Sequence, residues 1–163
     1  MAEESEEKDA RGVTISAQLV PGMGEIIRDL YVRQVLLGLI ADTTIGTYRN
    51  VLYQHGLWDF FRVFSISDEL GVRKPHRLMF DRARLEGKQY DVLVDRILMV
   101  GNNYPRDIAG GKQAGFDTCW FHWNNRYPMD IYPGAADGIV DSAAALSRWI
   151  DEWLNTVTPA REE

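Results

Sequence analysis

Short apolar runs alternate with amphipathic stretches along this chain. Residues 35–41 are continuously apolar, too few for a typical helix, and end in a polar loop, so they are predicted to form a buried parallel strand. Further short runs predict strands at residues 62–67, 96–101, 117–121 and 138–140. Apolar residues at helical spacing predict helices that begin at Pro21, end at Gly56, carry Phe80, and span residues 107–113 and 142–154.

Strands that alternate with helices in this way predict an α/β fold with one doubly wound parallel sheet. Ligands of such sheets bind beyond the carboxyl ends of the strands. The loops that should carry chemistry are therefore those that follow Ala41, Ser67, Gly101 and Phe121.

Composition supports one domain and excludes some partners. The chain has 163 residues, 45% hydrophobic and 26% charged, and we expect residues 12–157 to form the domain, with a disordered acidic tail at residues 1–11 and a frayed end at residues 158–163. The net charge of -6 gives no overall attraction to nucleic acid or to an anionic membrane. The sequence has no apolar run near the ~20 residues that span a bilayer, no signal peptide and a single cysteine, Cys119, so a cytoplasmic location is expected.

The first polar loop at the predicted sheet edge consists of Asp42, Thr43 and Thr44, between a strand and a helix. Hydroxyl groups and the amides of a helix N-terminus converge there, and such a place can bind a phosphate group. The same residues could instead cap the helix, so phosphate binding and capping both stay open.

Two further loops bring charged residues to the same edge. Lys74 is a compact cation that could steady a phosphoryl group and a neighbouring carboxylate, or could be a solvated surface residue. Asp107 could ligate a cation, orient Lys74 or cap its own helix. Asn102 stands where Mg²⁺ would prefer a carboxylate, and its amide oxygen could coordinate the ion without bringing a charge.

Four segments between Pro21 and Phe121 together resemble the catalytic core of the haloacid dehalogenase-like (HAD) hydrolases. They are Pro21-Gly22 before a helix, the strand and loop at 36–43 (LGLIADT), the loop at 71–75 (GVRKP) with Phe80 after it, and the segment at 98–107 (LMVGNNYPRD) with two Ala-Gly pairs after it. In this resemblance Lys74 takes the position of the family's lysine. Thr43 is a displaced substitute for the phosphate-binding hydroxyl residue, because Ala41 occupies the place where Ser or Thr often sits.

The resemblance implies a Rossmann-like core that transfers a phosphoryl group through an aspartyl-phosphate. In the family, an aspartate on the first strand attacks, and a second aspartate two residues later acts as acid and base. Mg²⁺ neutralises the phosphate oxygens, and the lysine stabilises the charge that develops. No cap-sized insertion is present in the sequence, so a core without a cap domain is expected.

The Asp-x-Asp pair of the family's first motif is absent before the second motif. In one account, residues 13–17 are a degenerate first strand, which puts Thr14 and Ser16 at the positions of the two aspartates and places this strand between those at 35–41 and 96–101. In the other, the chain lacks the first strand and residues 13–19 belong to the exit from a cap. A sheet without its central strand would leave two unpaired edges, which favours the first account and leaves the second open.

We therefore expect a phosphomonoesterase-type hydrolase with incomplete motifs and weak or absent activity, since loss of a nucleophile can lower a rate by about 10⁶. The alternatives are a non-catalytic phosphate-binding or regulatory module, and a subunit that binds a protein partner or a second copy through its Trp-rich face. The expected ligand is a small phosphorylated molecule. Mg²⁺ should bind weakly or not at all, because Asp107 is left as the main anionic ligand beside Lys74.

Overall fold

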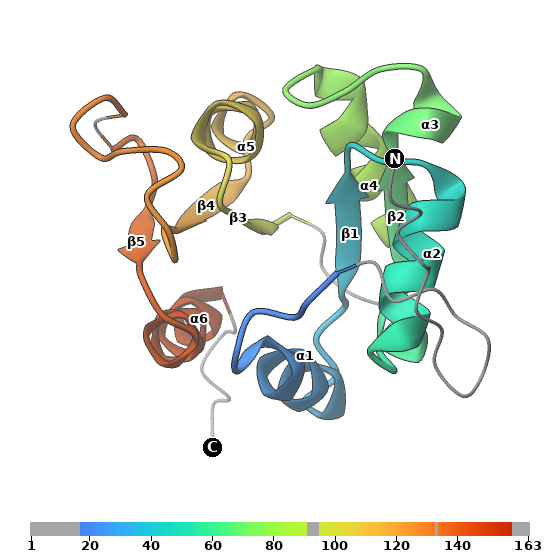
Figure 1. The fold of residues 1–163 in the computed structure, drawn as a ribbon, viewed down its shortest axis with the longest axis horizontal. Helices are drawn as coiled ribbons and strands as arrows, with labels where there is room; N and C mark the ends of the chain where they lie inside the picture. The colour runs from blue at the N-terminus through green and yellow to red at the C-terminus, as the bar shows by residue number, and fades with distance from the viewer. Residues whose placement is uncertain (1–16, 91–94, 133, 158–163) are drawn as a thin grey trace, which may run out of the picture.

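The computed structural model describes residues 17–90, 95–132 and 134–157, and its strands in these ranges form two parallel sheets. In the first sheet, β1 (Gly38–Ala41) pairs with β2 (Val63–Ile66). In the second, β4 (Asp117–Phe121) lies between β3 (Leu98–Gly101) and β5 (Gly138–Val140). Figure 1 shows β1 and β3 on the sides of the two sheets that face each other, and Ile40 packs against the apolar cluster that contains Met99.

The described residues do not by themselves form the single doubly wound sheet expected from the sequence, because no strand among them joins β1 to β3. The expected joining strand was residues 13–17, of which only Ala17 is described; Thr14 and Ser16 lie outside the described residues. The carbonyl oxygen of Ala17 accepts a hydrogen bond from Nε2 of His55 at 3.0 Å.

The position of His55 shows at which edge Ala17 lies. His55 ends α2 (Ile45–Gln54), which begins after the carboxyl end of β1 and leads back to the amino end of the parallel strand β2. Ala17 is therefore at the amino edge of β1 and β2.

Helices cover both sheets with apolar side chains. α1 (Met23–Val32) and α6 (Ala143–Val157) pack against β4 and β5 through a cluster that includes Leu30, Leu146 and the fully buried Cys119. α4 (Arg77–Gly87) buries Met79 and Phe80 against Met99 and Phe116. α2 and the 3₁₀ turn η1 (Trp58–Phe60) cover β2. None of the helices in the described ranges is long and apolar enough to cross a membrane.

Most predicted elements are confirmed, two of them with the predicted bounds, namely β4 and β5. The helix expected from Asp107 begins three residues earlier, as the wide helical turn η2 (Tyr104–Ala109), and continues as α5 (Gly110–Gln113). It begins there because Oδ1 of Asn103 caps it by accepting the N–H of Arg106 at 3.1 Å. The short helix α3 (Ser67–Leu70) was not predicted.

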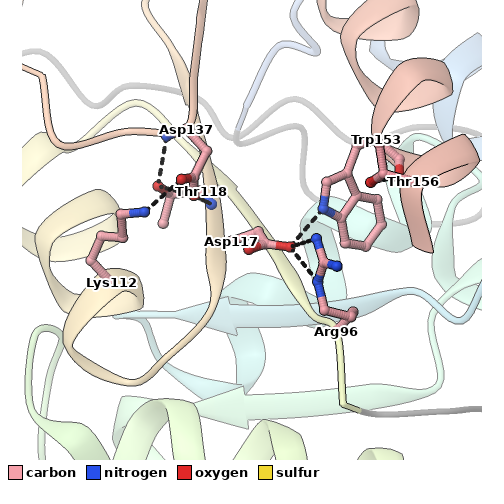
Figure 2. Close-up of polar contacts among 7 residues, drawn as sticks. All are labelled: Arg96, Lys112, Asp117, Thr118, Asp137, Trp153 and Thr156. Atoms are coloured by element: carbon pink, nitrogen blue, oxygen red, sulfur yellow. Dashed lines mark hydrogen bonds and ion pairs between the residues drawn. The ribbon is translucent and has the colours of Figure 1, made fainter.

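Polar contacts at the amino end of β4 fasten the C-terminal elements to the second sheet (Figure 2). Oδ2 of Asp117 accepts from Nε1 of Trp153 at 2.8 Å and from Arg96 at 2.7 Å. Asp137, just before β5, accepts the N–H of Thr118 at 2.8 Å and pairs with Lys112 at 2.6 Å. Among these contacts only that of Trp153 comes from the apolar side of α6, and Trp153 is half-buried.

Candidate active site

Lys74 and Asp107 form an ion pair at the carboxyl ends of the strands. Lys74 comes from the loop between α3 and α4, and Asp107 comes from η2 after β3, 33 residues further along the chain. Nζ of Lys74 lies 2.6 Å from Oδ1 of Asp107, and the two side chains are only 11% and 10% exposed. A short charge-assisted hydrogen bond of this kind offsets the desolvation of both charges and fixes the lysine in place.

Asp107 is held on its other side by the backbone. Its Oδ2 accepts the N–H of Asn103 at 3.1 Å. Gly101 is needed beside it, because a Cβ atom at Gly101 would lie 2.2 Å from that same oxygen. Asp107 is therefore not the cap of its helix, which was one of its three expected roles; Asn103 is the cap.

Asp42 joins the loop after β1 to the loop that carries the lysine. Its Oδ1 accepts the backbone N–H of Lys74 at 2.8 Å, and its Oδ2 lies 3.4 Å from Nη1 of Arg106. The side chain of Asp42 is only 8% exposed. An ionised carboxylate only accepts hydrogen bonds and repels a phosphate, so these contacts fit a residue that positions Lys74.

Thr43 and Thr44, in the same loop, differ in the hydrogen bonds that they make. Thr44 caps α2, since its Oγ1 accepts the N–H of Thr47 at 3.2 Å, and the capping interpretation is confirmed for this residue. The carbonyl of Thr43 accepts from Oγ of Ser67 at 3.2 Å. Within the described residues, the hydroxyl of Thr43 has no hydrogen-bond partner.

Asn102 is directed toward the end of β4. Its Nδ2 donates to the carbonyl of Phe121 at 3.2 Å and lies 3.5 Å from Oδ1 of Asn124. The backbone carbonyl of Asn102 accepts a hydrogen bond from Nε1 of Trp120 at 3.0 Å. The structure therefore brings Lys74, Asp107 and Asp42 together, but it shows no contact between the Asn102 side chain and Asp107.

The described residues do not fit the Mg²⁺ ion that the resemblance implies. All four carboxylate oxygens of Asp42 and Asp107 already accept a hydrogen bond or an ion pair. In the described part of the chain, no group of three or more His, Cys, Asp or Glu side chains could hold a metal. Mg²⁺ requires near-octahedral oxygen ligands and gives up its water reluctantly, so two engaged carboxylates are a poor site for it.

Sequence reasoning missed Arg106. The residue was visible directly before Asp107, but its contact with Asp42 joins positions 64 residues apart. The side chain of Arg106 is 46% exposed, which makes it the accessible cation of this group.

The sequence and the fold agree with a family of known proteins. The model of the haloacid dehalogenase-like hydrolase family matches residues 4–121, and the chain belongs to this family. The HAD-hydrolase YfnB from Bacillus subtilis, whose crystal structure contains bound magnesium, has a TM-score of 0.68 and 26% identity, over 82% of this chain and 56% of that one. A HAD phosphatase from Thermococcus onnurineus has the same fold, with a TM-score of 0.70 at 22% identity, over 82% of this chain and 58% of that one.

Two curated relatives are phosphate-releasing enzymes by name. Pyrimidine 5'-nucleotidase YjjG of Escherichia coli is 37% identical over 98 residues, 60% of this chain and 43% of the relative. Glyceraldehyde 3-phosphate phosphatase of Pyrococcus furiosus is 32% identical over 129 residues, 78% of this chain and 52% of the relative. The chain thus spans about half the length of the curated relatives it matches.

Proposed function

We propose that this chain binds the phosphate group of a small phosphorylated molecule at the carboxyl edge of its sheets, in a phosphomonoesterase-type site. The observation that carries the proposal is the partly buried Lys74, fixed through Nζ by Asp107 and through its backbone N–H by Asp42. A lysine held in this way presents its remaining N–H donors without losing side-chain entropy on binding. The relatives named as a nucleotidase and as a sugar-phosphate phosphatase support a phosphorylated ligand.

We further propose that turnover by this chain alone is weak or absent. In the family the attacking carboxylate belongs to the Asp-x-Asp pair, and no such pair stands before the second motif of this sequence. This absence also favours the second candidate function, a non-catalytic phosphate-binding or regulatory module.

A phosphatase assay and a binding measurement on the same samples test these proposals. Inorganic phosphate binding is measured by calorimetry, and turnover is measured with a generic aryl phosphate and Mg²⁺. We expect binding with little turnover, and we expect Lys74→Ala to abolish the binding. Lys112→Ala is the matched control, because Lys112 is in an equally short ion pair, with Asp137, outside the site. Robust turnover that falls in Lys74→Ala or Asp107→Ala would contradict the weak-activity proposal, and no phosphate binding would contradict the proposed function.

A further inference from the structure

The backbone of Arg106 is fixed, but its side chain is only loosely engaged. The N–H of Arg106 donates to the capping oxygen of Asn103 at 3.1 Å, which holds its Cα in the first turn of η2. One guanidinium nitrogen reaches Asp42 at 3.4 Å, longer than the roughly 2.7–2.9 Å of a strong charge-assisted hydrogen bond. The other guanidinium N–H groups have no partner within the described residues. Within the described residues, Arg106 therefore has guanidinium N–H groups that are both unpaired and exposed.

The charges of the neighbouring side chains indicate that a phosphate in this site would need a second positive group besides Lys74. Asp42 and Asp107 are balanced by Lys74 and Arg106, because each carboxylate contacts one of the two cations. A phosphate dianion that enters this group brings negative charge, and the described carboxylates do not form a Mg²⁺ site that would neutralise it. Arg106 can neutralise this negative charge, because a guanidinium group can donate to two phosphate oxygens at once. The contact between Arg106 and Asp42 is long, so Arg106 can exchange it for a phosphate oxygen.

We propose that Arg106 is a phosphate-binding residue of this site, and that the site takes up the dianionic phosphate of a phosphate monoester without a divalent cation. This inference rests on the proposed function. In the bound state, Lys74 keeps its ion pair with Asp107 and donates a second N–H to the phosphate. The guanidinium of Arg106 gives up its long contact with Asp42 and donates to two phosphate oxygens.

Calorimetric titration with inorganic phosphate, first in EDTA and then in excess Mg²⁺, tests the inference. The unmodified protein should bind in EDTA, with an affinity that Mg²⁺ changes little. Arg106→Ala should weaken binding by about tenfold or more, since it removes charge-assisted hydrogen bonds, and Arg106→Lys should recover part of that loss. Arg33→Ala is the matched control, because Arg33 is 39% exposed and pairs with two aspartates, but lies before β1 at the amino edge. Its affinity should equal that of the unmodified protein.

The outcomes separate this inference from the proposed function. Equal affinity in Arg106→Ala and the unmodified protein, with binding lost in Lys74→Ala, would overturn the role of Arg106 and leave the proposed function standing. Binding that appears only with Mg²⁺ would overturn metal-independent recognition alone. No binding by the unmodified protein under either condition would overturn the proposed function itself. Arg106 is exposed, so its variants should fold, which thermal melting of each sample verifies.

Discussion

A Cβ atom at Gly101 would lie 2.2 Å from Oδ2 of Asp107, so the carboxylate of Asp107 occupies the space that a side chain at Gly101 would need. The end of β3 is thus shaped around this carboxylate. Position 101 therefore requires glycine because a larger residue would not fit beside Asp107, and not because of its backbone angles.

Gly101→Ala should push Asp107 away from the N–H of Asn103 and destabilise the protein by about 1–3 kcal/mol, the range for forcing extra atoms into a packed site. Urea denaturation measures the change. Gly46→Ala is the control, because a Cβ at Gly46 meets nothing within 4 Å and alanine favours a helix. Equal stability of the two variants would show that the space beside Asp107 is not restricted.

Lys74→Met should leave the Asp107 carboxylate buried without its cation. Breaking a buried pair in this way destabilises a protein by about 3–5 kcal/mol, and because both groups keep some contact with solvent we expect a loss at the lower end of this range. The double variant Lys74→Met with Asp107→Leu should lose less than the sum of the single changes. A double-mutant cycle from chemical denaturation measures the coupling, and additive losses would mean that the pair is not coupled.

Asn102→Asp should strengthen Mg²⁺ binding, because it adds a carboxylate to a group of described residues that does not fit Mg²⁺ as it stands. Thr14→Asp should strengthen it further if residues 13–17 form the first strand. Calorimetric titration with Mg²⁺ compares these variants with Asn155→Asp, a change of equal charge on α6 outside the site. Tight Mg²⁺ binding by the unmodified protein would show that the ligands have been misplaced.

Because of Asp137, the folding stability of the protein should fall at acidic pH. Burial opposes its ionisation, but hydrogen bonds from Lys112 and Thr118 outweigh burial and lower the pKa of Asp137 below the ordinary 3.8. The unfolded chain then binds this proton more readily, so the contribution is present above the ordinary pKa and is lost as pH falls through the folded one. Asp137→Asn should lower the melting temperature at neutral pH and much less near pH ~3. The control is Asp130→Asn, a change at an exposed aspartate; equal effects of the two changes at both pH values would contradict this.

Cys119 should be unreactive while the protein is folded. Burial raises the pKa of its thiol from 9.0 to about 12, so the reactive thiolate is not formed at mildly alkaline pH. A thiol reagent should label the native protein very slowly and the denatured protein at once. The chain has one cysteine, so all labelling reports on Cys119. The stabilisation from the neutral thiol is complete below pH 9.0 and is lost as pH rises toward about 12. Rapid labelling under native conditions would contradict this burial.

The strands and long helices were predictable because each has a continuous local pattern. β4 and β5 were predicted residue for residue, since the apolar run of each is bounded by polar or glycine positions. The four-residue helix α3 is too short to show a helical period. Asn103 and Asp107 are both good capping residues, so the sequence could not decide which one begins the helix.

The site was only partly predictable for a different reason. Lys74 and Asp107 came from motifs that resemble a family, and the structure brings them together. The acceptor role of Asp42 and its contact with Arg106 depend on loops from distant parts of the chain meeting in space, which no local pattern records. The arrangement of the described strands in two sheets was likewise not predictable, because strand pairing is a tertiary choice.

The Lys74–Asp107 ion pair joins the two sheets that the described residues form. The lysine belongs to the half built on β1 and β2, and the aspartate belongs to the half built on β3, β4 and β5. Within the described residues no backbone ladder joins these halves, and the contacts that join them are side-chain contacts, which include the packing of Ile40 against the cluster of Met99. A ligand that engages Lys74 therefore acts on one of the contacts between the two sheets, and its binding is linked to the stability of that contact.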